Sequence, residues 1–537
     1  MGKMLHEPIA LDVNHMMSDV IGFQYGIDPC QVDGMKDAAS AAQRNVEKNR
    51  GTGWLGWMQL PYEQEEVVSH IERVAKSVRE QFDTFVVLGI GGSALGPIAI
   101  QQALNHLHYN ELPAEKRGGP RLYVEDNIDP ERMAALLDVI DVKKTCFNVI
   151  TKSGATAETM SQYLIISELL KKEVGEEWAK HIIATTDREK GNLIKLAKEN
   201  GFELFHIPAS VGGRFSELCP VGLLPAAVCG IDIREMLAGA AAMDERCSTD
   251  DVWKNPALLE AVLQYIAMQE MDINVQVVMP YADSLKYMAD WFCQLWAESL
   301  GKDGQGILPN IEIDSLLLTN DPGDRSVIMY QTKTDLWDER KNFEMSLSYI
   351  DPTIPRANFK IDSVEELAEH FVMWEYAVAM CGYLMRVCPF DQPDVASAKA
   401  VVLDILKEGQ PAPDFVQDYI GDVHMGEVEV RLAPCFKDCT DVQGALRALL
   451  TSIQPGDYFA LNAFLPFTGE GRREALELIR HGVAASRHTV SCLEVGPRYL
   501  HSTGQLQKGG QNNGVFLILS ADELKDIPLS EEAESLG

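Results

Sequence analysis

The sequence predicts an α/β protein with two doubly wound domains, each built on a mainly parallel sheet, and a C-terminal α/β extension. The chain has 537 residues, more than one hydrophobic core usually organises. From about residue 63, short apolar runs alternate with helical patterns, which is typical of parallel sheets covered on both faces. The alternation resumes after residues 409–441, a stretch rich in proline, glycine and acidic residues that we interpret as an excursion or linker.

The first domain, expected over residues 60–235, follows an N-terminal segment at residues 1–59. Each predicted strand is short and apolar, and several end in turns rich in glycine or hydroxyl side chains. The predicted strands are Phe85–Leu88, Arg121–Val124, Cys146–Ile150, His181–Ala184 and Glu203–Ile207. Helices are expected through Leu104, near Glu131–Val139, through about Leu170 and from Glu189.

The second domain, expected over residues 236–425, contains a buried strand and two conspicuous helices. The predicted elements are a strand over Val275–Met279, a helix over Asp283–Leu300, and a long helix that begins at an Asp362-x-x-Glu365 cap. Apolar residues recur at helical spacing along the long helix, which indicates a core position. The extension, residues 426–537, is predicted from strands at Asp457–Phe464, Thr489–Glu494 and Val515–Leu519 and a helix over Glu470–Ala485.

Composition limits the classes of partner and the location. Asp and Glu outnumber Lys and Arg by 80 to 47, giving a formal net charge of −33. This charge repels nucleic acid and anionic membranes, so neither is expected as a partner. Eleven thinly spread cysteines and a start without an apolar signal segment favour reduced thiols and a cytoplasmic location. Cys435 and Cys439 form the only close cysteine pair, and no second pair completes a zinc site, so no metal is predicted.

A glycine-rich turn, Gly89-Ile90-Gly91-Gly92-Ser93-Ala94-Leu95-Gly96, lies between a predicted strand and a predicted helix. Glycines there let backbone N–H groups close on a phosphate at the positive end of the helix. The acidic residue of a dinucleotide site is not evident about 20 residues on. Taken alone, the turn leaves nucleotide binding, sugar-phosphate binding and tight packing open.

A second turn, Thr151-Lys152-Ser153-Gly154-Ala155-Thr156, occupies the same position two strands later. An ordinary N-cap would explain one hydroxyl, at Thr156, but not those of Thr151 and Ser153 as well. Two such turns on one sheet can converge on a single phosphate group, whereas a dinucleotide domain needs no second turn.

Three further segments carry polar side chains suited to catalysis. Arg214, in Gly212-Gly213-Arg214-Phe215-Ser216, suits an oxyanion, although a solvated arginine in a surface turn remains open. Gln294 and Glu298 share one bulky helix face, where a carboxylate would be partly desolvated and could act as a base. An ion pair between Glu298 and Lys302, four residues on, is an equally acceptable interpretation.

The segment after Asp391-Gln392-Pro393 is predicted to be a helix. Lys399 lies seven residues after Gln392, two turns on, and therefore on the same helix face. Without further context, a solvated lysine is the default interpretation for Lys399.

Together these segments resemble the phosphoglucose isomerase family, over residues 50 to 405. The motifs appear in the family's order: GIGGS-x-x-GP at 89–97, TKSGATAET at 151–159, GGRFS at 212–216, Q-x-x-x-ES-x-GK at 294–302 and FDQP-x-V at 390–395. The resemblance implies two sugar-isomerase (SIS-type) domains, a sugar-phosphate substrate, a place in glycolysis and gluconeogenesis, usually a homodimer, and no metal or organic cofactor.

By position, the resemblance also implies roles for individual residues. Glu298 would carry a proton between C1 and C2 of the sugar, and Arg214 would stabilise the cis-enediolate. Lys399, Gln392 and Gln294 would contact the sugar. The phosphate would be held by Gly92, Ser93, Thr151, Lys152, Ser153 and Thr156.

The chain departs from the family at the histidine that opens the sugar ring, which is usually supplied by the partner subunit. The corresponding stretch, residues 321–331, has no histidine, and His370 lies on the apolar helix, where we expect it to be packed. The extension resembles the C-terminal part of fused transaldolase–phosphoglucose isomerase proteins and supplies His501. His501 is therefore the candidate ring opener, with a loop histidine bound to nearby hydroxyls as the alternative.

The expected activity is the interconversion of glucose 6-phosphate and fructose 6-phosphate, and three alternatives stay open. The enzyme could also act on mannose 6-phosphate. A non-catalytic sugar-phosphate sensor would keep both phosphate turns but has no use for Glu298 and Arg214 together. A nucleotide-dependent dehydrogenase is supported by the glycine turn alone.

Overall fold

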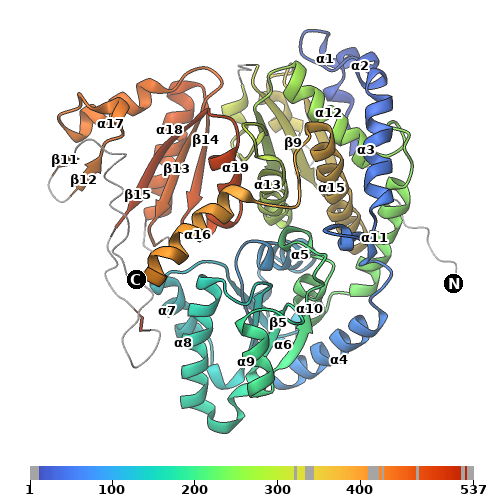
Figure 1. Ribbon diagram of the computed structural model, residues 1–537, viewed down its shortest axis with the longest axis vertical. Coiled ribbons are helices and arrows are strands. Elements are labelled where there is room, and N and C mark those ends of the chain that lie inside the picture. Colours follow the sequence, from blue (N-terminus) through green and yellow to red (C-terminus); the bar gives the residue numbers. More distant parts are fainter. Residues whose placement is uncertain are drawn as a thin grey trace.

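The computed structural model describes residues 11–319, 323–332, 344–408, 422–425, 428–466, 471–521 and 527–528. Three mainly parallel sheets organise these residues. Figure 1 shows the first sheet and its helices at the bottom of the molecule, with the second and third sheets side by side above them. The predicted α/β fold class is confirmed.

The first sheet has five parallel strands in the order β3-β2-β4-β5-β6. Their bounds are β2 (Thr84–Leu88), β3 (Arg121–Glu125), β4 (Thr145–Thr151), β5 (Ile182–Thr186) and β6 (Glu203–His206). Every residue of β2, β4 and β5 is buried, as expected for strands with helices on both faces. The helices are α4 (Glu65–Gln81), α5 (Leu95–Leu104), α6 (Ala114–Arg117), α7 (Pro130–Val139), α8 (Ala157–Val174), α9 (Asn192–Asn200) and α10 (Pro220–Val228).

The second sheet has the order β1-β10-β9-β7-β8 and is parallel except at β1. The bounds are β1 (Leu11–Asp12), β7 (Val275–Pro280), β8 (Leu308–Ile311), β9 (Arg325–Gln331) and β10 (Arg356–Lys360). The helices are α1 (Ser18–Ile21), α2 (Pro29–Gly34), α3 (Lys36–Lys48), α11 (Ile233–Cys247), α12 (Pro256–Glu270), α13 (Lys286–Leu300) and α15 (Val364–Met385). Most of α15 is buried, so its apolar pattern marks core as predicted.

The long helix begins one residue later than expected. Ser363, not Asp362, is the N-cap, and its hydroxyl accepts a hydrogen bond from the Glu366 N–H at 3.1 Å. The Asp362 N–H instead donates to the Glu366 carboxylate at 2.7 Å. Both residue types can cap a helix, and the path of the chain out of β10 decides between them.

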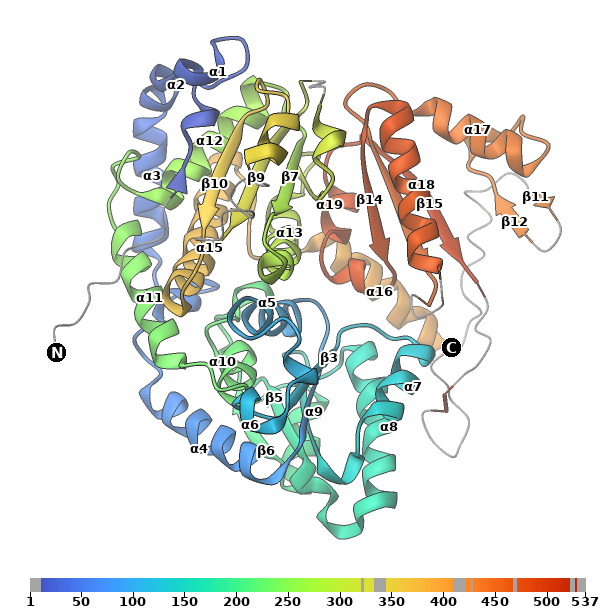
Figure 2. The same cartoon turned by 180° about the vertical axis from the view of Figure 1, so that it is seen from behind.

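The third sheet belongs to the extension and has three parallel strands in the order β14-β13-β15. Its elements are β13 (Tyr458–Phe464), β14 (Val490–Val495), β15 (Gly514–Ser520), α17 (Val442–Ser452), α18 (Arg472–Arg487) and α19 (Gly504–Gly509). Its Tyr458 and Val490 share one apolar cluster with Val275 and Val327 of the second sheet. The extension is therefore packed into the body of the molecule (Figure 2).

Helix α16 (Pro393–Glu408) runs between the upper part of the molecule and the first domain in Figure 1. After it, the segment that we predicted to be a linker lies partly outside the described residues. Its described part includes a two-stranded hairpin of β11 (Asp422–Met425) and β12 (Val428–Arg431). Apart from β1 and this hairpin, which crosses the expected boundary at residue 425, each sheet lies within one of the expected domain ranges. The domain boundaries themselves stay a prediction.

Candidate active site

The glycine turn after β2 is packed directly against the turn that carries Arg214. Gly91 has φ +58°, a conformation that favours glycine. A Cβ at Gly92 would lie 2.3 Å from the carbonyl carbon of Gly213, so a larger residue would push the two turns apart. Ser93 ends the single 3-10 turn Gly91–Ser93 within this segment and is half-buried. Glycine is thus required here for close approach of two backbones.

The second turn gathers three hydroxyl groups after β4, the strand next to β2. The Thr151 hydroxyl lies 2.8 Å from the Thr156 hydroxyl and 3.4 Å from that of Ser153, and Ser153 and Thr156 are 3.3 Å apart. Thr156 occupies the N-cap position of α8, yet its side chain makes no capping hydrogen bond. The ordinary capping role is therefore not realised, and the hydroxyls cluster at the positive end of a long helix.

Lys152 ties the second turn to the chain that leads to Arg214. Its ammonium group donates to the carbonyl oxygens of Ala209, at 2.8 Å, and Val211, at 2.6 Å. The same group lies 5.2 Å from the ring centre of Trp54, within cation–π range. Burial lowers the pKa of Lys152 from its ordinary value. The lysine joins the second turn to the segment before Arg214 and brings one positive charge to this edge of the sheet.

Arg214 is almost completely buried and reaches the helix that carries Glu298. Its side chain is 4% exposed, and one guanidinium nitrogen lies 3.5 Å from the Glu298 carboxylate. The Nε atom donates to the hydroxyl of Ser299 at 2.8 Å, and a terminal nitrogen donates to the Gln392 amide oxygen at 3.1 Å. The backbone carbonyls of Pro389 and Asp391 accept hydrogen bonds from the other terminal nitrogen of Arg214. A solvated surface arginine is excluded, because the guanidinium is fixed between two helices.

Glu298 does not pair with Lys302. The Lys302 ammonium instead contacts Asp391, with its carboxylate oxygen at 2.8 Å, and the carbonyl of Cys388. Glu298 accepts a hydrogen bond from the Gln294 amide at 3.1 Å and is 13% exposed on its side chain. Of the two interpretations open for Glu298, the structure removes the helix-end ion pair.

His501 approaches this helix from the extension. Its Nε2 lies 2.9 Å from a carboxylate oxygen of Glu158, in the first turn of α8, and its carbonyl accepts a hydrogen bond from Gln294 at 2.8 Å. Burial raises the pKa of Glu158, but the His501 hydrogen bond and the charges of His501 and Lys399 outweigh it and lower the pKa overall. Sequence reasoning missed Glu158, whose partner lies 343 residues away, and no local signal identifies such a pair.

Lys399 lies on an exposed face of α16, and its charge acts on Glu158. His370 is fully buried, as expected, and its Nε2 accepts a hydrogen bond from the Trp374 indole at 3.1 Å. Burial lowers the pKa of His370 to about 3, which leaves it neutral. The predicted residues thus meet at the carboxyl ends of β2 and β4 and around α13, the usual ligand position of parallel α/β sheets.

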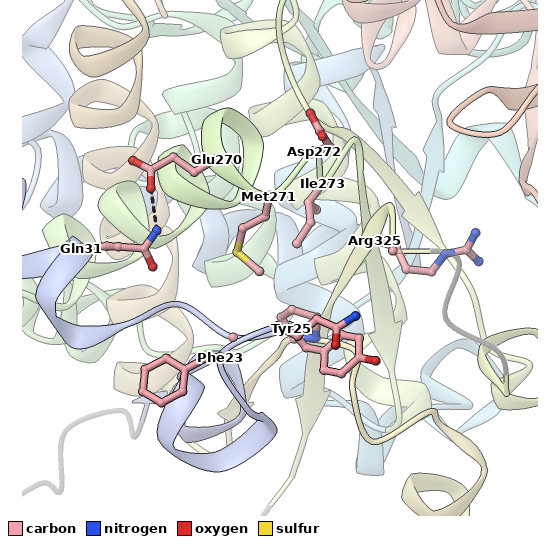
Figure 3. A pocket seen from close by; sticks show the side chains of 12 residues that line it. Phe23, Tyr25, Gln31, Glu270, Met271, Asp272, Ile273 and Arg325 are labelled. Atoms are coloured by element: carbon pink, nitrogen blue, oxygen red, sulfur yellow. Dashed lines mark hydrogen bonds between the residues drawn. The ribbon is translucent and has the colours of Figure 1, made fainter.

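A cavity of about 350 Å³ lies elsewhere, at the amino ends of β7 and β9. Figure 3 shows Phe23, Tyr25, Met271 and Arg325 among its lining residues. None of the predicted site residues lines it. Across the described parts of the chain, no group of three or more His, Cys, Asp or Glu side chains is placed to hold a metal ion, and no helix is long and apolar enough to cross a membrane.

Comparison with known proteins places the chain in one family. The family model for phosphoglucose isomerase matches residues 66–315. Glucose-6-phosphate isomerase of Carboxydothermus hydrogenoformans is 59% identical over 50% of this chain, a match that spans 58% of the relative's own length. The enzyme of that name from Shouchella clausii is 35% identical over 70% of this chain and 92% of its own.

A solved structure shows the same fold. The crystal structure of a glucose-6-phosphate isomerase from Chlamydia trachomatis superimposes with a TM-score of 0.62 at 21% identity, over 73% of this chain and 88% of the other. Since the match to the Shouchella clausii enzyme spans nearly the whole of that relative, the chain belongs to the phosphoglucose isomerase family.

Proposed function

We propose that the protein interconverts glucose 6-phosphate and fructose 6-phosphate, with Glu298 as the base, Arg214 as the partner of the developing oxyanion and His501 as the ring opener. The observation that carries this proposal is the convergence of Arg214, Glu298 and the His501–Glu158 pair on one place. The relatives named above are isomerases, which gives no support to a non-catalytic sensor or to a dual enzyme for mannose 6-phosphate.

Phosphate binding is assigned to the two turns. The hydroxyls of Thr151, Ser153 and Thr156 lie within 3.4 Å of one another and can donate to a phosphate that takes the place of their mutual contacts. The free N–H groups at the start of α8 add a positive potential. Ser93, Gly92 and Lys152 complete the assigned set.

Ring opening comes first in the proposed mechanism. The C1–O5 bond of the cyclic sugar breaks, a proton is delivered to O5, and the C1 hydroxyl passes its proton to solvent water as the aldehyde forms. An imidazole held by a carboxylate can donate the proton to O5. Glu158 holds the His501 ring in that way, through the contact of 2.9 Å.

Proton transfer between carbons follows in the open chain. The Glu298 carboxylate removes the C2 proton, and negative charge develops on the enediolate oxygens. The O2 proton passes to O1, and Glu298 returns its proton to C1, so that the carbonyl group forms at C2. Arg214, fixed by Ser299 and Gln392, offers a preorganised positive charge beside that base. Gln294, Gln392 and Lys399 are assigned to the sugar hydroxyls.

We further infer a cytoplasmic homodimer, as the family resemblance implies. The His501–Glu158 contact lies within one chain, so this pair needs no histidine from a partner. Sedimentation of the purified protein tests the oligomeric state, and a single monomeric species would contradict it.

The direct test follows conversion of glucose 6-phosphate to fructose 6-phosphate by NMR. The wild-type protein should convert it, and Glu298→Gln should lower kcat by about 10³-fold while still binding the substrate in calorimetry. Glu270→Gln, an exposed glutamate outside the assigned site, is the matched control. Unchanged turnover in Glu298→Gln would remove the catalytic assignment.

A further inference from the structure

The turn that carries His501 is tied to the carboxyl end of β3. Arg498 begins this single turn and His501 ends it. The Arg498 guanidinium donates to the Asp126 carboxylate at 2.8 Å, and the Arg498 N–H donates to the Asn127 side chain at 3.2 Å. The Asn127 amide in turn donates to the carbonyl of Gly496 at 3.1 Å.

The anchor of this turn is the ion pair between Arg498 and the buried carboxylate of Asp126. The Asp126 side chain is 2% exposed and is shared by two arginines, with Arg132 at 2.6 Å from its other oxygen. Asp290, on α13, lies 3.8 Å from Arg498. Asp126 raises the pKa of Arg498, so the guanidinium stays charged. The Arg498 side chain is 28% exposed, but its loss would remove one of the two partners of a buried carboxylate, so this contact holds the start of the turn.

The same helix supports both ends of the turn. The Gln162 amide donates to the carbonyl of Asn127 at 2.8 Å, and Gln162 lies one helical turn after Glu158 on α8. Glu158 holds the imidazole of His501, while Gln162 holds the residue that binds Arg498. Asn127, which binds Arg498, and the imidazole of His501 are therefore both held by the same helix, α8.

His501 is also confined from the side of the glycine turn. Its carbonyl accepts from Gln294, and a Cβ at Gly91 would lie 2.8 Å from that carbonyl oxygen. A shift of the turn in this direction would collide with Gly91. The position of His501 relative to α13, which carries Glu298, is therefore set by contacts on three sides.

We propose that Arg498, through its ion pair with Asp126, is a positioning residue that fixes His501 for opening the sugar ring. This inference rests on the proposed function, because it gives His501 the task of ring opening. Its consequence is specific: loss of Arg498 should slow ring opening and leave the C2-to-C1 proton transfer by Glu298 intact. Small displacements of a catalytic group are costly, so the effect should be measurable.

If Arg498 served only to dock the extension on the first domain, removing another docking residue should slow ring opening equally. The chain offers a matched control for docking. Arg472 of α18 lies 3.4 Å from Glu131 of α7 and also joins the extension to the first domain, but it lies outside the His501 turn. Arg472→Met tests docking without touching the anchor of His501.

The experiment separates ring opening from proton transfer. In a Glu298→Gln background, exchange between the α and β anomers of glucose 6-phosphate, read by exchange NMR, reports ring opening alone. Adding Arg498→Met should lower the enzyme-dependent exchange rate about 10-fold, and adding His501→Asn should lower it at least as much. Adding Arg472→Met should leave it unchanged.

Folding and the parent activity are controlled separately. Arg498→Met leaves Asp126 with one partner, so the pair Asp126→Asn with Arg498→Met, which removes both charges, is measured beside it, with circular dichroism for each variant. Equal losses in Arg498→Met and Arg472→Met, or normal anomer exchange in a folded Arg498→Met protein, would overturn the inference. So would a Glu298→Gln protein that does not accelerate anomer exchange. If the wild-type protein instead fails to isomerise glucose 6-phosphate, the proposed function itself fails.

Discussion

The imidazole of His501 and the carboxylate of Glu158 lie 2.9 Å apart, although 343 residues separate them in the chain. The histidine comes from the third sheet's extension and the glutamate from the first domain. A chain without a histidine in residues 321–331 thus supplies His501, whose backbone carbonyl accepts a hydrogen bond from Gln294, the residue that also donates to the predicted base.

This contact predicts coupled effects of mutation. His501→Asn should lower kcat on glucose 6-phosphate by about 10²-fold, and Glu158→Gln by about 10-fold, because the amide still holds the ring but cannot stabilise its charged form. Combining them should cost no more than His501→Asn alone, since the two act as one unit. Steady-state kinetics on the four proteins checks this, and strictly multiplicative losses would contradict the pairing.

Removal of a hydroxyl from the second turn should affect binding more than turnover. Thr156→Val deletes one of three clustered hydroxyls and should raise KM about 10-fold with kcat nearly unchanged, because the phosphate is bound alike in ground and transition states. Thr159→Val, on the same helix, is the control, since the Thr159 hydroxyl is buried and has no hydrogen-bond partner within the described part of the chain. A similar KM in both variants would remove Thr156 from the phosphate site.

The contact between the two glycine turns predicts a sharp steric effect. Gly92→Ala should destabilise the protein by about 2 kcal/mol and reduce activity, because the new methyl group would meet the backbone of Gly213. Gly34→Ala is the matched control: its Cβ would meet no atom within 4 Å, and its φ is not positive. Urea unfolding of both variants gives the comparison, and equal stability would show that the turns separate at little cost.

Buried Glu260 predicts a pH dependence of stability. Burial raises its pKa to about 7 in the folded protein, above the ordinary value of 4.5. The folded state therefore holds the proton more tightly, so this contribution to stability is present below pH 4.5 and is lost as the pH rises to 7. The loss amounts to about 3 kcal/mol. Glu260→Gln should remove this pH dependence. The free energy of unfolding of the variant, measured with urea, should therefore rise relative to that of the wild type between pH 5 and pH 8. A constant difference across that range would contradict the assignment.

The local sequence determined the strands of the first and third sheets, strand β7 of the second sheet, and the two turns that we propose bind phosphate, but it did not reveal β8, β9 and β10. Apolar runs such as Phe85–Leu88, followed by glycine or hydroxyl residues, permit few structures other than a buried strand and a tight turn. The motifs also named Glu298, which shares a helix face with Gln294, and Arg214, which follows a pair of glycines.

Tertiary structure decided the partners. Lys302 binds Asp391 and not Glu298, Thr156 joins a hydroxyl cluster and does not cap α8, and Ser363 begins the long helix. Each of these residues had a reasonable local alternative, and its surroundings in the folded chain selected among them. His501 depended most on tertiary structure, because its contact with Glu158 joins segments 343 residues apart, which local spacing cannot reveal.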